Sequence, residues 1–183
     1  PVGLAHCVPW SSTTELDAPL DVTGWNYAAR YADSRKKWPN LPIVYTESAS
    51  AYSTRGYYDD FPMPAKKDDY PATARISSYD HNSAYYSDPA DVEFALMERD
   101  RFVAGEFVWT GFDYIGEPVP FVADGWGHFT KRQLAKAEES RISSFGIVDL
   151  VGIPKDRFYL YRSHWAPEKQ TIHILPHWNW PER

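Results

Sequence analysis

The residues best suited to chemistry are carboxylates that lie beside aromatic residues where predicted strands end. Glu47 closes the β-branched and aromatic run Ile43–Thr46, and Trp109 closes a second such run. Asp113 and Glu117 follow shortly after Trp109. Glycoside hydrolysis uses two carboxylates on either side of the scissile bond, with an aromatic floor for the sugar. Since an unperturbed Glu has a pKa near ~4.3, the Glu47 carboxylate would be ionised at neutral pH and able to attack an anomeric carbon.

Other kinds of site find little support in the sequence. The six histidines form no His-Glu-x-x-His motif, and Pro176 breaks the helical spacing of His173 and His177. The single cysteine, Cys7, excludes an internal disulfide framework and a cysteine zinc site. The Gly-x-Ser-x-Gly elbow of serine hydrolases and the glycine-rich phosphate loops are both absent. We therefore predict neither a metal nor a cofactor.

Composition narrows the class of partner. Aromatic residues make up 16% of the chain, with 8 Trp and 13 Tyr, and the net charge is -6. Such an excess of Trp and Tyr fits carbohydrate binding, where rings stack on sugars, and fits a large core equally well. The absence of a basic stripe argues against nucleic acid. No run approaches the ~18 apolar residues of a membrane span.

The segment around Glu47 predicts a strand–helix–strand unit. Residues 21–27 predict a short strand, and Ala28–Lys37 predict a helix that Pro39 ends. Ile43–Glu47 is apolar on both faces, as in a parallel strand buried on both sides. Active sites of (β/α) barrels lie at the C-terminal ends of such strands, which is where Glu47 lies. A salt bridge or a helix cap is the alternative interpretation of Glu47.

A second helix is predicted after the long segment 51–87, which has no convincing period. Asp88 is expected at its N-cap and Pro89 at its first helical position. The positions that this helix should turn inward are Val92, Ala95, Leu96 and Arg99. The other predicted elements are a strand at 2–5, a loop at 9–19, a strand at 103–109, a loop at 119–144, a short apolar run at 145–149, a helix at 156–165 and a strand at 171–180.

Three stretches resemble glycoside hydrolase family 2, and above all its bacterial β-galactosidase branch. They are Pro42–Ser50, Gly105–Pro118 and Ser144–Tyr161, of which the second and third are long and specific. The resemblance runs from about Asp21 to the C-terminus. Leu175–Trp180 also resembles the entry to the β-sandwich that follows the barrel in that branch.

The resemblance assigns roles to three residues at strand ends. Glu47, on barrel strand seven, is implied to be the nucleophile. Trp109, on strand eight, is implied to lie under the galactosyl ring. Tyr27 matches the strand-six tyrosine that hydrogen-bonds the nucleophile in the family.

Further carboxylates belong to the same motifs. Asp149 is implied to approach the sugar hydroxyls. Asp113 and Glu117 belong to the signature, either as sugar contacts or as supports of the loop. Glu106 lies on the opposite strand face from Trp109, so we interpret it as structural.

The chain departs from the family pattern at the catalytic acid/base residue. In the family this residue is a Glu preceded by Asn at the end of strand four, and the chain contains no Asn-Glu dipeptide. The counterparts of the family's sugar-binding N-terminal domain and first barrel strands are missing as well. We predict an α/β fold in which residues 1–168 are the C-terminal part of an incomplete (β/α)8 TIM barrel. Residues 169–183 are predicted to begin a following β-sandwich domain.

The activity implied by the resemblance is that of a retaining exo-glycosidase. A β-galactosidase acting on β-galactoside-containing oligo- or polysaccharides leads, with β-glucuronides, β-mannosides and β-glucosides as alternatives. The rival from another class is a non-catalytic carbohydrate-binding protein or an inactive fragment. The expected partners are the missing barrel and sugar-binding parts, and the full protein could also form a homo-oligomer. The resemblance is compatible with a periplasmic or secreted location, and a cytoplasmic location stays open.

Overall fold

The computed structural model describes residues 1–58, 75–84, 86–116, 142–176 and 178. The chain divides into two compact units. The first unit comprises Pro1–Ser50 and Ser83–Trp109, and the second comprises Ala51–Asn82 and Thr110–Arg183.

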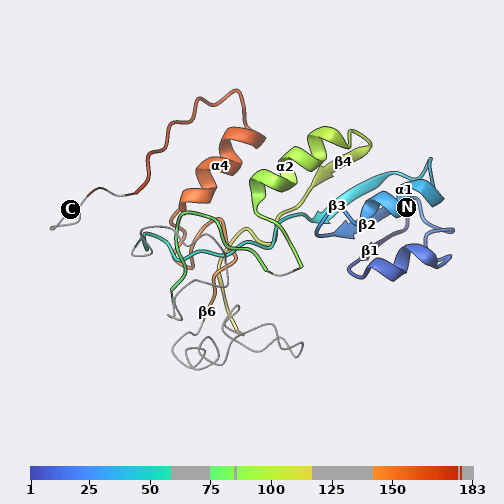
Figure 1. Ribbon diagram of the computed structural model, residues 1–183, viewed down its shortest axis with the longest axis horizontal. Helices are drawn as coiled ribbons and strands as arrows, with labels where there is room; N and C mark the ends of the chain where they lie inside the picture. The colour runs from blue at the N-terminus through green and yellow to red at the C-terminus, as the bar shows by residue number, and fades with distance from the viewer. Residues whose placement is uncertain (59–74, 85, 117–141, 177, 179–183) are drawn as a thin grey trace. The chain divides into compact units, whose positions relative to one another are not determined.

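The first unit contains a four-stranded parallel sheet whose strands follow the order of the chain (Figure 1). The strands are β1 (Gly3–His6), β2 (Val22–Asn26), β3 (Ile43–Glu47) and β4 (Val103–Glu106). Helix α1 (Tyr31–Lys37) connects β2 to β3, and helix α2 (Ala90–Arg99) lies between β3 and β4 along the chain. Parallel neighbours joined through helices are the α/β arrangement that the sequence predicted.

Aromatic side chains from the sheet and from α1 form the core of this unit. Trp25, Tyr31, Ile43 and Tyr45 are fully buried, and Met97 of α2 packs against them. Both helices therefore cover the same face of the sheet. On β3, the alternate positions 44 and 46 are only partly buried, so the expectation of a strand buried on both faces is not met in this structure.

Helix α1 begins three residues later than predicted. Tyr27, Ala28 and Ala29 have positive φ angles of 59°, 52° and 49°, which are incompatible with a right-handed helix. The regular helix starts only at Tyr31. The predicted start at Ala28 was therefore wrong, although its end at Lys37 was right.

Helix α2 also differs in detail from its prediction. Pro89 takes the N-cap position with extended backbone angles, so the predicted cap by Asp88 was wrong. Its buried residues are Ala90, Glu93 and Phe94, whereas Val92 is 41% exposed. The predicted inward stripe was wrong because the true one, at i, i+3, i+4 and i+7, includes a Glu.

Two further boundaries shift in the first unit. A short 3₁₀ helix (η1, Pro9–Thr13) occupies part of the predicted loop 9–19. Strand β4 ends at Glu106 rather than at Trp109, but main-chain hydrogen bonds continue beyond it. The Trp109 amide donates to the Ala49 carbonyl at 3.1 Å, and the Ser48 amide donates to the Phe107 carbonyl at 2.9 Å.

The second unit contains a two-stranded antiparallel sheet and one described helix. The strands are β5 (Tyr114–Ile115) and β6 (Ile142–Ser143), and the helix is α4 (Asp156–Trp165), as predicted. Residues 171–175 form no strand, so that prediction was wrong for the described part of the tail. Most of the predicted loop 119–144 lies outside the described residues. Within the described part of the chain, no helix is both long and apolar enough to cross a membrane.

Candidate active site

Tyr27 and Glu47 meet at the carboxyl ends of two neighbouring strands. Asn26, the last residue of β2, is the register partner of Glu47, the last residue of β3. The Tyr27 hydroxyl donates a hydrogen bond to Glu47 Oε2. The Tyr27 amide donates a second one to the Glu47 carbonyl at 2.7 Å. The two residues are thus joined through both side chain and main chain.

The electrostatics of Glu47 reflect partial burial. Burial raises the pKa of the Glu47 carboxyl above its ordinary value, while a hydrogen bond from Asn26 favours the charged form. The Thr46 hydroxyl donates to Asn26 Oδ1 at 2.7 Å, which leaves the amide nitrogen of Asn26 for the carboxylate. A partly exposed carboxylate held by a phenol and an amide is fixed in orientation, as a nucleophile or a general base must be.

Trp109 lies beside the segment that follows Glu47. Its amide bonds to Ala49, and Trp109 forms an isolated parallel bridge with Ser50. The Ser50 amide in turn donates a hydrogen bond to Ser87 Oγ at 2.7 Å. The Trp109 side chain is partly exposed. The structure therefore brings Tyr27, Glu47 and Trp109 into one unit at one end of the sheet.

A buried polar group that the sequence did not reveal lies next to the turn that begins at Tyr27. Glu93 of α2 is fully buried, and its Oε2 accepts a hydrogen bond from the Tyr45 hydroxyl at 2.8 Å. The Tyr45 oxygen accepts a hydrogen bond from the Ala29 amide at 2.9 Å. Burial raises the pKa of Glu93 to about 7 and raises the pKa of Tyr45 as well. In the sequence, Glu93 stood at a position that we had not placed on the inner face.

Two more residues at this site went unpredicted. Asn26 gave no signal beyond its place at the end of a predicted strand. Tyr86 lies in a segment without a period, and its ring centroid is 4.7 Å from that of Tyr27. That tilted ring contact helps to fix the Tyr27 side chain.

Asp113 belongs to the second unit, where it has protein partners. Its Oδ1 accepts hydrogen bonds from Lys155 Nζ at 2.6 Å and from the Gly146 amide at 2.8 Å. Lys155 is itself fully buried and also donates to the Ser53 carbonyl at 2.7 Å. Burial raises the pKa of Asp113 and lowers that of Lys155 to about 8. A side chain on Gly146 would collide with the Asp113 amide, so glycine is required there.

Asp149 also belongs to the second unit and organises a turn. Its Oδ1 accepts hydrogen bonds from the amides of Val151 and Ile153, and its Oδ2 lies 2.5 Å from Arg55 Nε. Burial opposes ionisation of Asp149, but the bonds from Ile153, Arg55 and Val151 outweigh it and lower its pKa. Glu117, the remaining predicted site residue, lies outside the described residues.

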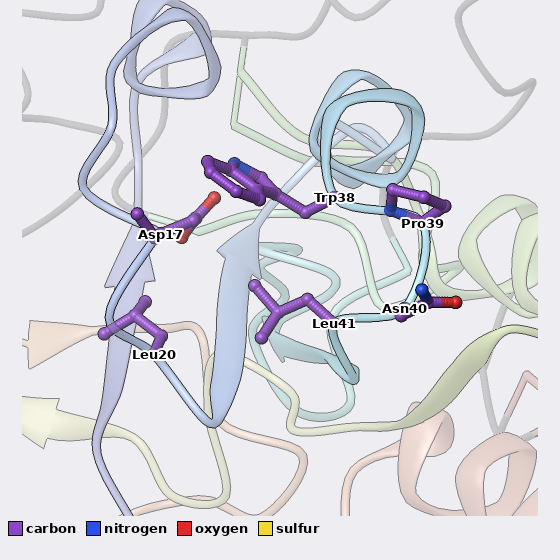
Figure 2. A pocket seen from close by; sticks show the side chains of 7 residues that line it. Asp17, Leu20, Trp38, Pro39, Asn40 and Leu41 are labelled. Carbon is purple, nitrogen blue, oxygen red and sulfur yellow. The ribbon is translucent and has the colours of Figure 1, made fainter.

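A hollow of about 280 Å³ lies away from these strand ends, where α1 leads into β3 (Figure 2). Its lining includes Trp38, Leu41 and Asp17. Both oxygens of Asp17 are already used, by His6 and Thr23 on one side and by Ser34 on the other. The hollow lies near the start of β3, whereas Glu47 lies at its end. Among the described residues, no group of three or more His, Cys, Asp or Glu could hold a metal ion.

Comparison with known proteins adds two curated relatives and a group of solved structures. The chain is 40% identical over 169 residues to beta-galactosidase BoGH2A of Bacteroides ovatus, covering 88% of this chain and 18% of that protein. It is 27% identical over 170 residues to a protein of Formosa agariphila whose name proposes a beta-glucuronidase, covering 76% of this chain and 14% of that protein. No protein-family model matches the sequence.

Among solved structures, the chain is similar to Bacteroides uniformis beta-glucuronidase 2 covalently bound to cyclophellitol-6-carboxylate aziridine. The TM-score is 0.59 at 18% identity, and the match covers 94% of this chain and 18% of that one. This likeness concerns the fold. The chain thus spans less than a fifth of the length of the curated relatives that it matches.

Proposed function

We propose that this chain, which belongs to glycoside hydrolase family 2, carries the nucleophile of a retaining exo-glycosidase. The enzyme would be a β-galactosidase that releases terminal β-galactosyl units from oligo- or polysaccharides. The observation that carries the proposal is the hydrogen bond from Tyr27 to Glu47, which fixes one carboxylate at the carboxyl end of a parallel strand.

In the proposed reaction, the Glu47 carboxylate attacks the anomeric carbon while the bond to the leaving oxygen breaks. The leaving oxygen takes its proton from an acid/base group that the chain does not supply, since it lacks the family's Asn-Glu dipeptide. The same group then deprotonates a water molecule, which attacks the anomeric carbon and releases Glu47. Trp109 would lie under the sugar ring throughout.

For the architecture, we propose that residues 1–168 form the C-terminal part of a (β/α)8 barrel, with β1 to β4 as strands five to eight. Four parallel strands in chain order, with helices on one face, support this assignment. The two outer strands, β1 and β4, would pair with strands of the missing barrel part. Residues 169–183 would begin the β-sandwich domain.

Galactose is the proposed sugar because the relative with the higher identity is a β-galactosidase. The relative named for glucuronide cleavage matches at 27% identity. The Asn and Lys pair that the glucuronidase branch uses for the sugar carboxylate is not evident in this sequence. Comparing nitrophenyl galactoside with nitrophenyl glucuronide, using the complete protein, tests the choice of sugar.

The roles of Asp149, Asp113 and Glu117 in sugar binding stay predictions. For Asp113 and Asp149, the hydrogen bonds within the second unit support the alternative role of holding loops.

Glu47→Gln tests the proposed nucleophile in the complete protein that contains this chain. The amide keeps the shape but removes the attacking charge, so kcat should fall by several orders of magnitude, about 10⁴-fold or more. A 2-fluoro galactosyl inhibitor with a good leaving group should label the peptide that contains Glu47. Glu98→Gln, at an exposed position of α2, is the matched control and should leave kcat unchanged.

Labelling of Asp113 instead of Glu47 would overturn the assignment of the nucleophile. The rival, a non-catalytic carbohydrate-binding protein, predicts that the complete protein binds galactosides without turnover. It also predicts that the complete gene encodes no Asn-Glu after a strand-like segment upstream.

A further inference from the structure

Glu93 is a fully buried acidic residue that has no role in the proposed reaction. It lies in α2, on the face that packs against the sheet, together with Ala90 and Phe94. Burying a carboxylate is unfavourable unless hydrogen bonds compensate for the lost water. The partners of Glu93 therefore indicate what it does.

Those partners converge on the turn that follows β2. Glu93 Oε1 lies 3.4 Å from the Ala28 amide, and Glu93 Oε2 accepts the Tyr45 hydroxyl proton. The Tyr45 oxygen accepts the Ala29 amide hydrogen. Two successive amides of the turn are thus held by Glu93, one directly and one through Tyr45.

The turn needs such support because of its backbone. Tyr27, Ala28 and Ala29 are three consecutive non-glycine residues in the left-handed region. This conformation is unfavourable for residues that carry a Cβ, and such residues persist only where the surroundings hold them. Ala and Arg otherwise favour the helix that the sequence predicted here.

The first residue of the turn is Tyr27, whose hydroxyl contacts Glu47. Since the backbone conformation at Tyr27 sets the direction of its side chain, the supports of the turn also set the position of that hydroxyl. We propose that Glu93 is a positioning residue which, together with Tyr45, holds the turn of residues 27–29 so that the Tyr27 hydroxyl stays on the nucleophile Glu47. This inference rests on the proposed function.

A carboxylate suits this position for a chemical reason. Both groups that face Glu93, the Ala28 N–H and the Tyr45 O–H, are hydrogen-bond donors. A carboxylate offers an acceptor oxygen to each of them, whereas a carboxamide offers one acceptor and one donor. Glu93→Gln therefore keeps the size of the side chain but cannot serve both donors at once.

A double-mutant cycle in the complete protein tests the proposal. Glu93→Gln, Tyr27→Phe and the double variant are compared for kcat and KM on a nitrophenyl galactoside. We expect Glu93→Gln to lower kcat about 10-fold by misplacing Tyr27, with KM changed less. On the Tyr27→Phe background, it should change kcat by less than about twofold, the scatter allowed for independent sites. The exposed Glu98→Gln on the same helix should have no effect.

Two results would overturn the proposal: full additivity of the two changes, or an unchanged kcat in Glu93→Gln. If Glu93→Gln does not fold, Tyr45→Phe removes the Ala29 tether and enters the same cycle with the same expected outcome. Glu47→Gln separates this inference from the proposed function. An active Glu47→Gln protein contradicts the function itself, whereas an inactive one with additive Glu93 and Tyr27 effects contradicts only the positioning role.

Discussion

The Tyr27 hydroxyl donates a hydrogen bond to Glu47 Oε2 from the neighbouring strand end. That bond joins residues 20 positions apart in the chain, and the Tyr27 amide bonds to the Glu47 carbonyl as well. A phenol held against a carboxylate orients it and favours its charged form. The pair is therefore the natural place to begin testing the site.

Removing the hydroxyl should separate orientation from packing. Tyr27→Phe keeps the ring and its contact with Tyr86, but it removes the hydroxyl that donates a hydrogen bond to Glu47. We expect kcat of the complete protein to fall by about 10- to 100-fold, as for loss of a group that positions a reacting atom, with Tm nearly unchanged. Steady-state kinetics and thermal unfolding on the same preparation measure both. Lower stability with normal turnover would point to a packing role.

The proposed position of Trp109 under the sugar ring can be tested by removing its side chain. Trp109→Ala removes an aromatic surface next to the segment after Glu47, and we expect a loss of about 1–3 kcal/mol of transition-state binding, which is about 5- to 150-fold in kcat/KM. Trp10→Ala is the matched control because that side chain is 65% exposed in the same unit. Equal kcat/KM for the Trp109 variant and the wild type would show that Trp109 serves the core alone.

The turn before α1 marks the limit of what the sequence could predict. Ile43–Glu47 was predicted within its observed bounds because a β-branched run after Pro has few other outcomes. Residues 28–30 have high helix propensity, yet tertiary contacts from Glu93 and Tyr45 hold residues 28 and 29 in the left-handed region. Such contacts, 65 and 16 positions apart, leave no local pattern to recognise.

The candidate site was predictable where residue type and strand end coincide. Glu47, Tyr27 and Trp109 all stand at or just after predicted strands, and the structure places them in one unit. Glu93 was missed because a helical stripe is recognised by its apolar members, and an acidic residue within it looks solvent-facing. The family resemblance implied that Asp149 approaches the sugar and left Asp113 as either a sugar contact or a loop support. The hydrogen-bond partners of both residues became visible only in the folded second unit.

Glu93 should give the protein a distinct pH dependence of stability. Burial raises its pKa to about 7 from an ordinary value of 4.5, while Asp88 and Glu106 add to the shift and the bonds from Tyr45 and Ala28 oppose it. Burial raises the pKa of the Tyr31 hydroxyl, and the charge of Glu93 raises it further. Because the folded state binds the proton more tightly, this contribution to stability is complete below pH 4.5 and is lost as the pH rises through about 7.

The measurement is the unfolding midpoint of wild type against Glu93→Gln across that pH range, in the complete protein. The amide does not titrate, so the stability of the wild type relative to the variant should fall by up to roughly 3 kcal/mol between the two pKa values. Glu98→Gln removes an exposed carboxyl from the same helix. Its unfolding midpoint should change with pH in the same way as that of the wild type. A constant difference between wild type and Glu93→Gln would contradict the raised pKa.

The 183-residue chain on its own should not hydrolyse glycosides. Without a proton donor the leaving oxygen departs as an alkoxide, and general acid catalysis is typically worth about 10²–10⁴-fold. A reactive aryl leaving group needs less help, so chemistry alone does not exclude a covalent intermediate.

Incomplete folding is the stronger reason to expect that the isolated chain is inactive. The outer strands β1 and β4 have one neighbour each in the described sheet, and their apolar side chains include Leu4 at 43% exposure and, just after β4, Phe107 at 66%. Unpaired strand edges with exposed apolar side chains promote aggregation in competition with folding. We expect the isolated chain to be poorly soluble and without measurable turnover of nitrophenyl galactosides. Adding the missing barrel part, in cis or as a second chain, should restore both properties, whereas a soluble monomer of the chain alone with ordinary turnover would refute both arguments.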